Sequence, residues 1–408
     1  MIVKEYVKAF EKLGFGMFVH FGVYSVIGRG EWHKAYVTAE EYYPYCKQFN
    51  PEKDWAKQLV STAKKAGCKY ITLTTRHHDG YSLFDTCGLS ALDAPHFIGR
   101  DLVREFVDAC NEAGIIPFFY HTLLDWYEES YKTDFKKYLQ YLRDSVEILC
   151  KNYGKIGGLW FDGMWDKPGE DWEEDALYAT IRKHQPEAMI INNTGLKARG
   201  ALGHIELDSV TFERGRPGEI NMEGSPKYIA SEMCQTLNEH WGYTKLDFCY
   251  KSLKDLIEDF CVCRRYGSNF LLNVGPMENG YLRPLDKAML EEMGKWVEIY
   301  KEALYLPRPS GIEITSKPED FILEHEGAYY LFCHNLPMAL NPDVALTKDA
   351  VFVDEFQFDK KIKSITAMDG EKVTYEVRQE NGITSIKCPY YEYGTHLAVR
   401  IAKIEVEK

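Results

Sequence analysis

The strongest constraint on the fold is a repeated alternation of short apolar runs with helical segments. Each apolar run has the length of one strand. The runs span 14–22, 69–75, 115–121, 157–163, 188–193, 208–213, 226–233 and 269–275, which makes eight. Unbroken apolar runs of this length are typical of strands that are buried on both faces of a parallel sheet.

The segments between these runs have the pattern of amphipathic helices. Residues 54–67 and 101–114 each carry apolar side chains at helical spacing, and the second segment begins at Asp101 and ends at Gly114. A strand followed by a helix, repeated eight times, predicts a (β/α)8 TIM-like barrel in the α/β class. A doubly wound open sheet is the alternative, but no glycine-rich phosphate loop follows the first predicted strand.

The pattern changes after a linker at 304–311. Beyond it, apolar and polar residues alternate, and turn residues separate the segments. These segments span 321–334, 360–370, 371–388 and 395–408. Alternation with turns predicts a C-terminal antiparallel β-sandwich domain. We therefore expect a catalytic barrel over 1–308 and a β-sandwich over 309–408.

Charge and composition exclude two classes of partner. The chain has 49 Lys and Arg against 62 Asp and Glu, a net charge of −13, and no long basic run. Such a chain is a poor ligand for nucleic acid or anionic lipid, and it has no apolar stretch long enough to span a membrane. Residues 1–16 lack the apolar core of a signal peptide, so we expect a cytoplasmic protein; a trimmed form of a secreted protein would read the same.

Polar side chains stand where the predicted strands end. In a TIM barrel the carboxyl ends of the strands form the active site, so these side chains should converge on one pocket. They are His20, Arg76, His77, His78, Asp79, Tyr120, His121, Asp162, Asn192, Asn193 and Glu213. This convergence indicates an enzyme.

Asp162 is the strongest candidate for a functional residue among them. It follows the buried run Gly-Gly-Leu-Trp-Phe, and a charge at that place is costly unless it is paired or lies in a cleft. Trp160 lies on the same face of the strand, two residues earlier. The alternative readings are structural: Asp162 as a loop cap before Gly163, and His20 as a buried histidine bonded to a carbonyl.

Six segments together resemble the α-L-fucosidases of glycoside hydrolase family 29. They are FGMFVHFGVYS (15–25), GEW (30–32), TTRHHDGYSLFDT (74–86), GLWFDG (158–163), SEMCQTLNEHWGY (231–243) and NFLLNVGPMENG (269–280). The resemblance implies a retaining exo-glycosidase that removes terminal α-linked L-fucose from glycans and needs no metal or other cofactor.

The resemblance also implies roles for individual residues. Asp162 falls on the family's nucleophile. The fucose-binding residues fall on His20, Glu31, Trp32, His77, His78, Tyr120 and Trp160. A retaining glycosidase needs a second carboxyl group about 5–5.5 Å from the nucleophile. We expect Glu213, at the end of the sixth predicted strand, to be this acid/base, with Glu232 as the alternative.

The chain departs from the family at the end of the fifth predicted strand. Many relatives read Asn-Asp-Arg there, whereas this chain reads Asn192-Asn193-Thr194. An arginine that could orient the nucleophile is therefore missing from that place. Arg199 and Arg214 are the candidates to replace it.

Two other functions stay open from the sequence. A metal-dependent TIM-barrel hydrolase would use the histidines as ligands, but adjacent histidines on an extended chain point to opposite sides. A catalytically silent fucose-binding lectin-like protein would keep the histidines and tryptophans without turnover. The preferred fucosyl linkage and the oligomeric state are not determined by the sequence.

Overall fold

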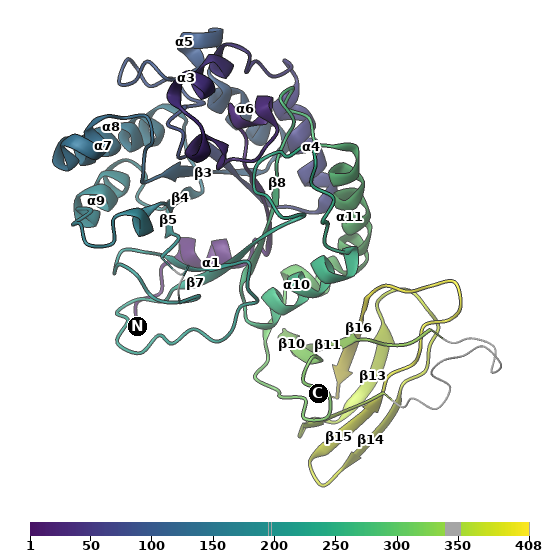
Figure 1. Ribbon diagram of the computed structural model, residues 1–408. Coiled ribbons are helices and arrows are strands. Elements are labelled where there is room, and N and C mark those ends of the chain that lie inside the picture. Colours follow the sequence, from purple (N-terminus) through teal and green to yellow (C-terminus); the bar gives the residue numbers. More distant parts are fainter. Residues whose placement is uncertain (195, 197, 339–351, 408) are drawn as a thin grey trace. The chain divides into compact units, whose positions relative to one another are not determined.

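The computed structural model describes residues 1–407 apart from 195, 197 and 339–351. Eight parallel strands close into a barrel in the order of the chain. Helices surround the strands (Figure 1). The strands are β1 Phe15–Val19, β2 Tyr70–Arg76, β3 Ile116–Thr122, β4 Gly158–Asp162, β5 Met189–Asn192, β6 Ser209–Glu213, β7 Ala230–Thr236 and β8 Asn269–Val274.

The predicted strands are confirmed, because each expected apolar run contains or overlaps one strand of the barrel. The seventh is displaced: β7 starts at Ala230, whereas the expected run starts at residue 226. Large side chains from β1 to β4 fill the barrel interior, among them Phe18, Tyr70, Phe118 and Trp160. The barrel is therefore a packed core, and in barrels of this kind the active site lies at the carboxyl-terminal ends of the strands.

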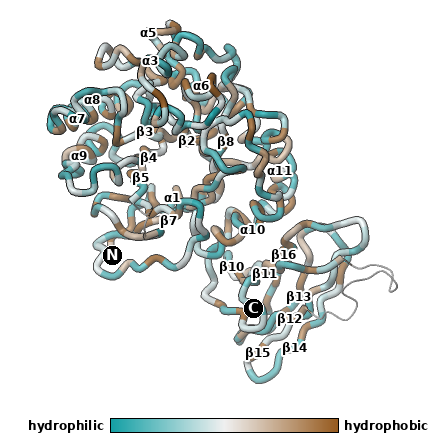
Figure 2. The backbone as a smooth tube through the Cα atoms, in the orientation of Figure 1, coloured by the Kyte–Doolittle hydropathy of each residue, from teal (hydrophilic) through white to brown (hydrophobic). Residues whose placement is uncertain are grey.

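The two helices predicted over 54–67 and 101–114 are present as α4 (Trp55–Ala66) and α6 (Leu102–Ala113). α8 is Phe135–Asn152 and α9 is Glu174–His184. In α6 the Asp101 carboxylate accepts the Arg104 amide at 2.9 Å, and Gly114 ends the helix with a φ of 72°. Figure 2 shows hydrophobic and hydrophilic residues alternating along these helices, as expected for helices that bury one face.

The expectation of a helix after every strand is wrong at two places. Among the described residues, β5 and β6 are each followed by a loop that contains no helix. Both loops are rich in helix-breaking residues. These include Gly200 and Gly203 after β5, and Pro217, Gly218 and Gly224 after β6.

The strands after the barrel form two antiparallel sheets. One has the order β13-β16-β11-β10-β9 and the other β12-β15-β14. The bounds are β9 Arg308–Pro309, β10 Phe321–His325, β11 Ala328–His334, β12 Val353–Gln357, β13 Ile362–Ala367, β14 Glu376–Glu380, β15 Ile383–Lys387 and β16 Val399–Val406. Leu331 and Ile404 of the larger sheet share one apolar core with Phe356 and Ile386 of the smaller sheet. The expected β-sandwich is thus confirmed.

The chain divides into two compact units, and each unit consists of two separate stretches of the sequence. One unit comprises residues 1–251 and 268–292, and the other comprises 252–267 and 293–408. The second unit includes α10 (Leu253–Arg265) and the end of α11 (Pro284–Tyr305) as well as the sandwich. This division differs from the expected single boundary at 308/309. Within the second unit, Glu302 of α11 accepts hydrogen bonds from Tyr330 and Lys403 at 2.7 Å each.

No described helix combines the length and the low polarity that crossing a bilayer requires.

Candidate active site

A cavity of about 300 Å³ opens among the loops that follow the barrel strands. This volume is at the lower end for ligand pockets and suits one monosaccharide. The lining residues are Phe18, His20, Glu31, Trp32, His77, His78, Tyr120, Trp160, Asp162, Trp165, Asn193, Leu196, Glu213 and Trp241. All nine side chains that the sequence assigned to catalysis and sugar binding, apart from the alternative Glu232, therefore lie together.

The Asp162 carboxylate is surrounded by hydrogen-bond donors. Tyr120 Oη donates to Oδ2 at 3.2 Å, and Asn193 Nδ2 donates to Oδ1 at 3.3 Å. His78 Nε2 lies 3.5 Å from Oδ2. Burial by itself would raise the pKa of Asp162, but His78, Asn193 and Tyr120 outweigh it and hold the pKa below its usual range. Asp162 is therefore ionised at neutral pH, as a nucleophile must be.

Asn193 connects the two acidic groups of the pocket. The same Nδ2 that contacts Asp162 Oδ1 at 3.3 Å also donates to Glu213 Oε2 at 2.6 Å. These two oxygens are therefore separated by at most the sum of the two distances, about 5.9 Å. The asparagine oxygen accepts from Thr211 Oγ1 at 3.1 Å, which fixes the orientation of the amide.

Glu213 has the electrostatic environment of a general acid. Burial and the negative charge of Asp162 raise the pKa of Glu213 above its usual value, against the opposing effect of Asn193. Two neighbouring carboxyl groups with pKa values moved in opposite directions are the arrangement in which one acts as acid and the other as anion.

The arginines considered as replacements contact other groups. Arg199 Nε donates to the main-chain oxygen of Glu213 at 2.7 Å, and Arg214 donates to the main-chain oxygen of Glu239 at 2.6 Å. The side chain that contacts Asp162 from the end of β5 is Asn193 itself.

The hydrogen bonds of His20 fix its tautomer. Asn273 Nδ2 donates to the Trp241 carbonyl at 2.7 Å, so Asn273 Oδ1 is the atom that accepts from His20 Nδ1 at 2.6 Å. Burial lowers the pKa of His20 to about 3, so the ring is neutral. The lone pair of Nε2 is then available to accept a hydrogen bond from a hydroxyl group in the pocket.

The same reasoning assigns a proton to Nδ1 of His78, so its Nε2 donates to Asp162 only when the ring carries a second proton. Thr122 Oγ1 donates to the Leu124 carbonyl at 2.6 Å and therefore accepts from His78 Nδ1 at 2.7 Å. His77 and His78 both line the pocket, with ring centres 4.2 Å apart. The expectation that adjacent histidines point to opposite sides is wrong here, because both lie beyond Arg76, where β2 ends and the chain turns.

Aromatic rings form the floor and the mouth of the cavity. Tyr120 is stacked between His77 and Trp160, with interplanar angles of 13° and 21°. At the mouth, Trp32 is 38% exposed and stacks on Trp165 at 5.6 Å. The remaining predicted binding residue, Glu31, is buried and accepts the Gly242 amide at 2.7 Å.

Glu232, the alternative acid/base, lies outside the lining of the cavity, next to Trp160. Its carboxyl group accepts from Trp160 Nε1 at 3.0 Å and from Tyr70 Oη, and only 1% of the residue is exposed. Burial raises the pKa of Glu232 to about 7. The carboxyl group of Glu232 thereby anchors the indole of Trp160.

Sequence reasoning missed four residues of the lining, which are Phe18, Trp165, Leu196 and Trp241. Trp165 lies on a short 3-10 helix after β4 and Trp241 lies in a loop, and sequence periodicity does not indicate which way such side chains point. Asn193 was expected in the pocket and lines it. Asn192 was expected there too but donates to Tyr178 Oη at 3.0 Å, and the strand-end residues Arg76, Asp79 and His121 also lie outside the lining.

Comparisons with known proteins agree with this geometry. A sequence model described as "Alpha-L-fucosidase" matches residues 3–302. The tissue alpha-L-fucosidase of Rattus norvegicus is 28% identical over 337 residues, which cover 74% of this chain and 70% of the relative.

Solved structures extend the likeness to the whole chain. Alpha-L-fucosidase isoenzyme 1 from Paenibacillus thiaminolyticus superposes with a TM-score of 0.81 at 27% identity and covers 99% of both chains. A family 29 alpha-L-fucosidase from Bacteroides thetaiotaomicron, trapped as a covalent intermediate, gives a TM-score of 0.80 at 23% identity over 99% of this chain and 97% of its own. With the family match over most of its length, the chain belongs to the α-L-fucosidase family, the retaining glycoside hydrolases of family 29.

Proposed function

We propose that the chain hydrolyses terminal α-L-fucosides by double displacement, with Asp162 as the nucleophile and Glu213 as the general acid/base. The observation that carries the assignment is the shared Asn193 nitrogen. It keeps the two carboxylate oxygens within about 5.9 Å. A bound of about 5.9 Å between this pair of oxygens is compatible with the carboxyl separation of about 5–5.5 Å in retaining glycosidases.

In the first step Glu213 donates its proton to the glycosidic oxygen while Asp162 attacks the anomeric carbon. The bond to the leaving group breaks, and a fucosyl ester of Asp162 forms. In the second step the Glu213 carboxylate takes a proton from water, the water oxygen attacks the anomeric carbon, and Asp162 leaves. Two inversions return the α configuration.

The histidines would recognise the sugar hydroxyls. The neutral ring of His20 presents Nε2 as an acceptor, and His78 presents Nε2 toward Asp162 and the pocket. The flat faces of Trp160 and Trp241 suit the apolar face and the methyl group of fucose. The substrate is therefore a fucosylated oligosaccharide or glycoconjugate, bound through its terminal sugar.

The test compares wild type with Asp162→Ala, Glu213→Ala and Glu232→Ala on 4-nitrophenyl α-L-fucoside, with and without azide. We expect Asp162→Ala to lose activity by at least about a thousandfold and azide to rescue it as β-fucosyl azide. Azide should rescue Glu213→Ala with retained α configuration. Far-UV circular dichroism checks that each variant is folded.

Two results would contradict the assignment. Azide rescue with retained configuration in Glu232→Ala, but not in Glu213→Ala, would move the acid/base to Glu232. Wild type that binds fucose without turnover of the aryl fucoside or of a branched fucosylated trisaccharide would favour the lectin-like alternative.

We also propose that the protein works in a reducing compartment such as the cytoplasm. All eleven cysteines are free, and nine of them are buried. This pattern is usual where glutathione keeps thiols reduced. Localisation of the tagged full-length gene product, with retention of activity in millimolar thiol, tests this proposal.

A further inference from the structure

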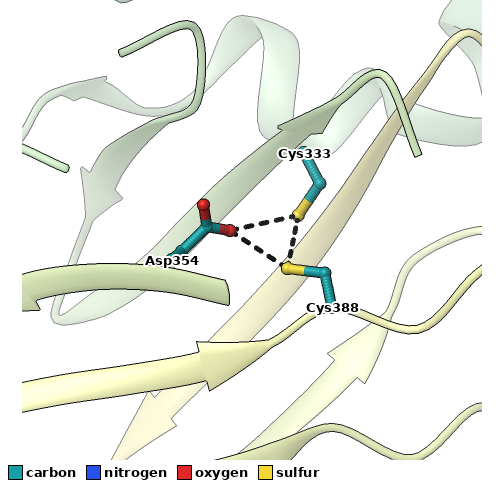
Figure 3. Close-up of side chains that lie close together, drawn as sticks. All are labelled: Cys333, Asp354 and Cys388. Carbon is teal, nitrogen blue, oxygen red and sulfur yellow. Dashed lines mark hydrogen bonds between the residues drawn. The ribbon is translucent and has the colours of Figure 1, made fainter. Parts of the chain in front are cut away.

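Two cysteines and one aspartate meet in the core of the β-sandwich (Figure 3). Cys333 lies on β11 of the larger sheet, Asp354 lies on β12 of the smaller sheet, and Cys388 directly follows β15. The three residues are 0%, 0% and 2% exposed, respectively. The cluster therefore spans the two sheets and is closed to solvent.

The surroundings of the cluster make an unpaired carboxylate costly. Cys333 and Cys388 belong to the same apolar core as Leu331, Phe356 and Ile386. Asp354 Oδ1 is buried and has no hydrogen-bond partner among the residues that the structure describes. A buried oxygen of this kind normally has a partner, so the site lacks one.

The neighbouring cation does not supply that partner. Lys317 Nζ donates to Asp320 Oδ2 at 2.7 Å, and Asp320 Oδ1 accepts from the amide and the ring of His334. Lys317 makes its hydrogen bond to Asp320, not to Asp354. Asp354 interacts with Asp320 as well as with the two thiols.

The distances within the cluster fit a shared metal ion. Sγ of Cys333 lies 3.3 Å from Sγ of Cys388, and Asp354 Oδ2 lies 3.0 Å from Cys388 Sγ and 4.0 Å from Cys333 Sγ. Around a tetrahedral zinc ion, two sulfur ligands stand about 3.8 Å apart, and sulfur and oxygen stand about 3.5 Å apart. Each distance has to change by only about half an ångström.

A disulfide fits the same atoms less well. A sulfur–sulfur bond of about 2.05 Å would require the two sulfur atoms to approach by more than an ångström in a packed core. It would also remove the two thiol hydrogens that contact the Asp354 carboxylate.

We propose that Cys333, Cys388 and Asp354 bind one thiophilic divalent cation of the zinc type, which joins the two sheets of the sandwich. The two sulfur atoms and Asp354 Oδ2 are three ligands. Oδ1 of the same carboxylate has no hydrogen-bond partner among the described residues and would be a fourth, more distant ligand, so the proposed site is a distorted tetrahedron. As the dication binds, the two thiol protons leave to solvent, and nothing is oxidised. From the sequence we expected no metal or other cofactor for the chain; this proposal departs from that expectation.

The experiment uses the full chain, expressed with zinc and kept reduced with a phosphine. Metal content is measured by inductively coupled plasma mass spectrometry. Cobalt(II), introduced by refolding in its presence, then serves as the spectroscopic probe. We expect about one equivalent of zinc, and cobalt spectra with thiolate charge-transfer bands and the intense visible bands of a tetrahedral site.

Matched variants separate this site from adventitious binding. Cys388→Ala and the isosteric Asp354→Asn should lose the cobalt bands, and their thermal unfolding should no longer respond to zinc. The double variant Cys87→Ser/Cys249→Ser removes the two exposed thiols and should keep about one equivalent. At free zinc about a hundredfold above Kd, the unfolding equilibrium of the wild type should shift about a hundredfold toward the folded state.

Three results would overturn the proposal. The first is wild type that contains no metal and stays without cobalt bands after refolding, with eleven titratable thiols. The second is two fewer thiols together with a cross-linked peptide pair containing Cys333 and Cys388. The third is full binding by a folded Asp354→Asn variant. Turnover of the aryl fucoside reports the barrel independently, so a failure here does not affect the fucosidase assignment.

Discussion

Replacing Asn193 with alanine should move both limbs of the pH–activity profile to higher pH. In a profile of kcat/KM, the ascending limb reports ionisation of Asp162, and the descending limb reports loss of the proton from Glu213. Asn193 Nδ2 donates to both carboxyl groups. An N–H donor stabilises a carboxylate relative to the carboxylic acid, so its removal raises both pKa values.

The contacts give the size of the two shifts. A hydrogen bond to a charged group contributes about 1.5–3 kcal/mol. Both carboxyl groups face an open pocket, so water replaces part of each bond, and we expect about 1 kcal/mol, or about 0.7 pH unit, for each limb. The contact to Glu213 is shorter, 2.6 Å against 3.3 Å, so the descending limb should move further. Without the Asn193 hydrogen bond, the Asp162 carboxylate is held less firmly in one orientation, and kcat/KM at the optimum should also fall about tenfold.

The assay is stopped-time release of 4-nitrophenol from the aryl fucoside across the acidic and neutral range. Thr211→Val serves as a graded control. It removes only the 3.1 Å hydrogen bond that orients the Asn193 amide and should move both limbs in the same direction by a smaller amount. Limbs that stay in place in a folded Asn193→Ala variant, or that move in opposite directions, would refute the reasoning.

Two further substitutions, at Glu232 and Gly163, test residues that support the lining of the site. The pKa of Glu232 is raised to about 7 in the folded protein, so the stability that this group contributes is full below its unfolded pKa and is lost as the pH rises through 7. In urea titrations, the free energy of unfolding of wild type relative to Glu232→Gln should therefore fall by about 3 kcal/mol between pH 4.5 and pH 7. A difference that does not change with pH would contradict this. Gly163→Ala should reduce kcat/KM at least about tenfold, because φ is 100° and the new Cβ would stand 2.9 Å from the Leu124 amide nitrogen, displacing the chain next to Asp162. Gly88→Ala is the control, because Gly88 also has a positive φ but has open space around it. This variant should lose only about 1 kcal/mol of stability and keep its turnover. Equal kinetics of the two variants would show that the contact between the new Cβ at position 163 and Leu124 does not affect activity.

The sequence alone determined the barrel and the two catalytic candidates. The apolar runs of a parallel strand are a local pattern, and so are the Asp and Gly that begin and end α6. Asp162 and Glu213 stand at strand ends, and the barrel brings strand ends together whatever lies between them. The sequence also predicted the change to alternating strands after the linker.

The tertiary structure decided the contacts between distant segments. Asn193 bridges Asp162 and Glu213 because β5 lies between β4 and β6 in the closed sheet, a relation that no local pattern carries. Glu232 lies behind Trp160 because of the position of β7 in the barrel. Which face a loop residue presents depends on packing between segments far apart in the chain, and sequence periodicity does not describe that packing.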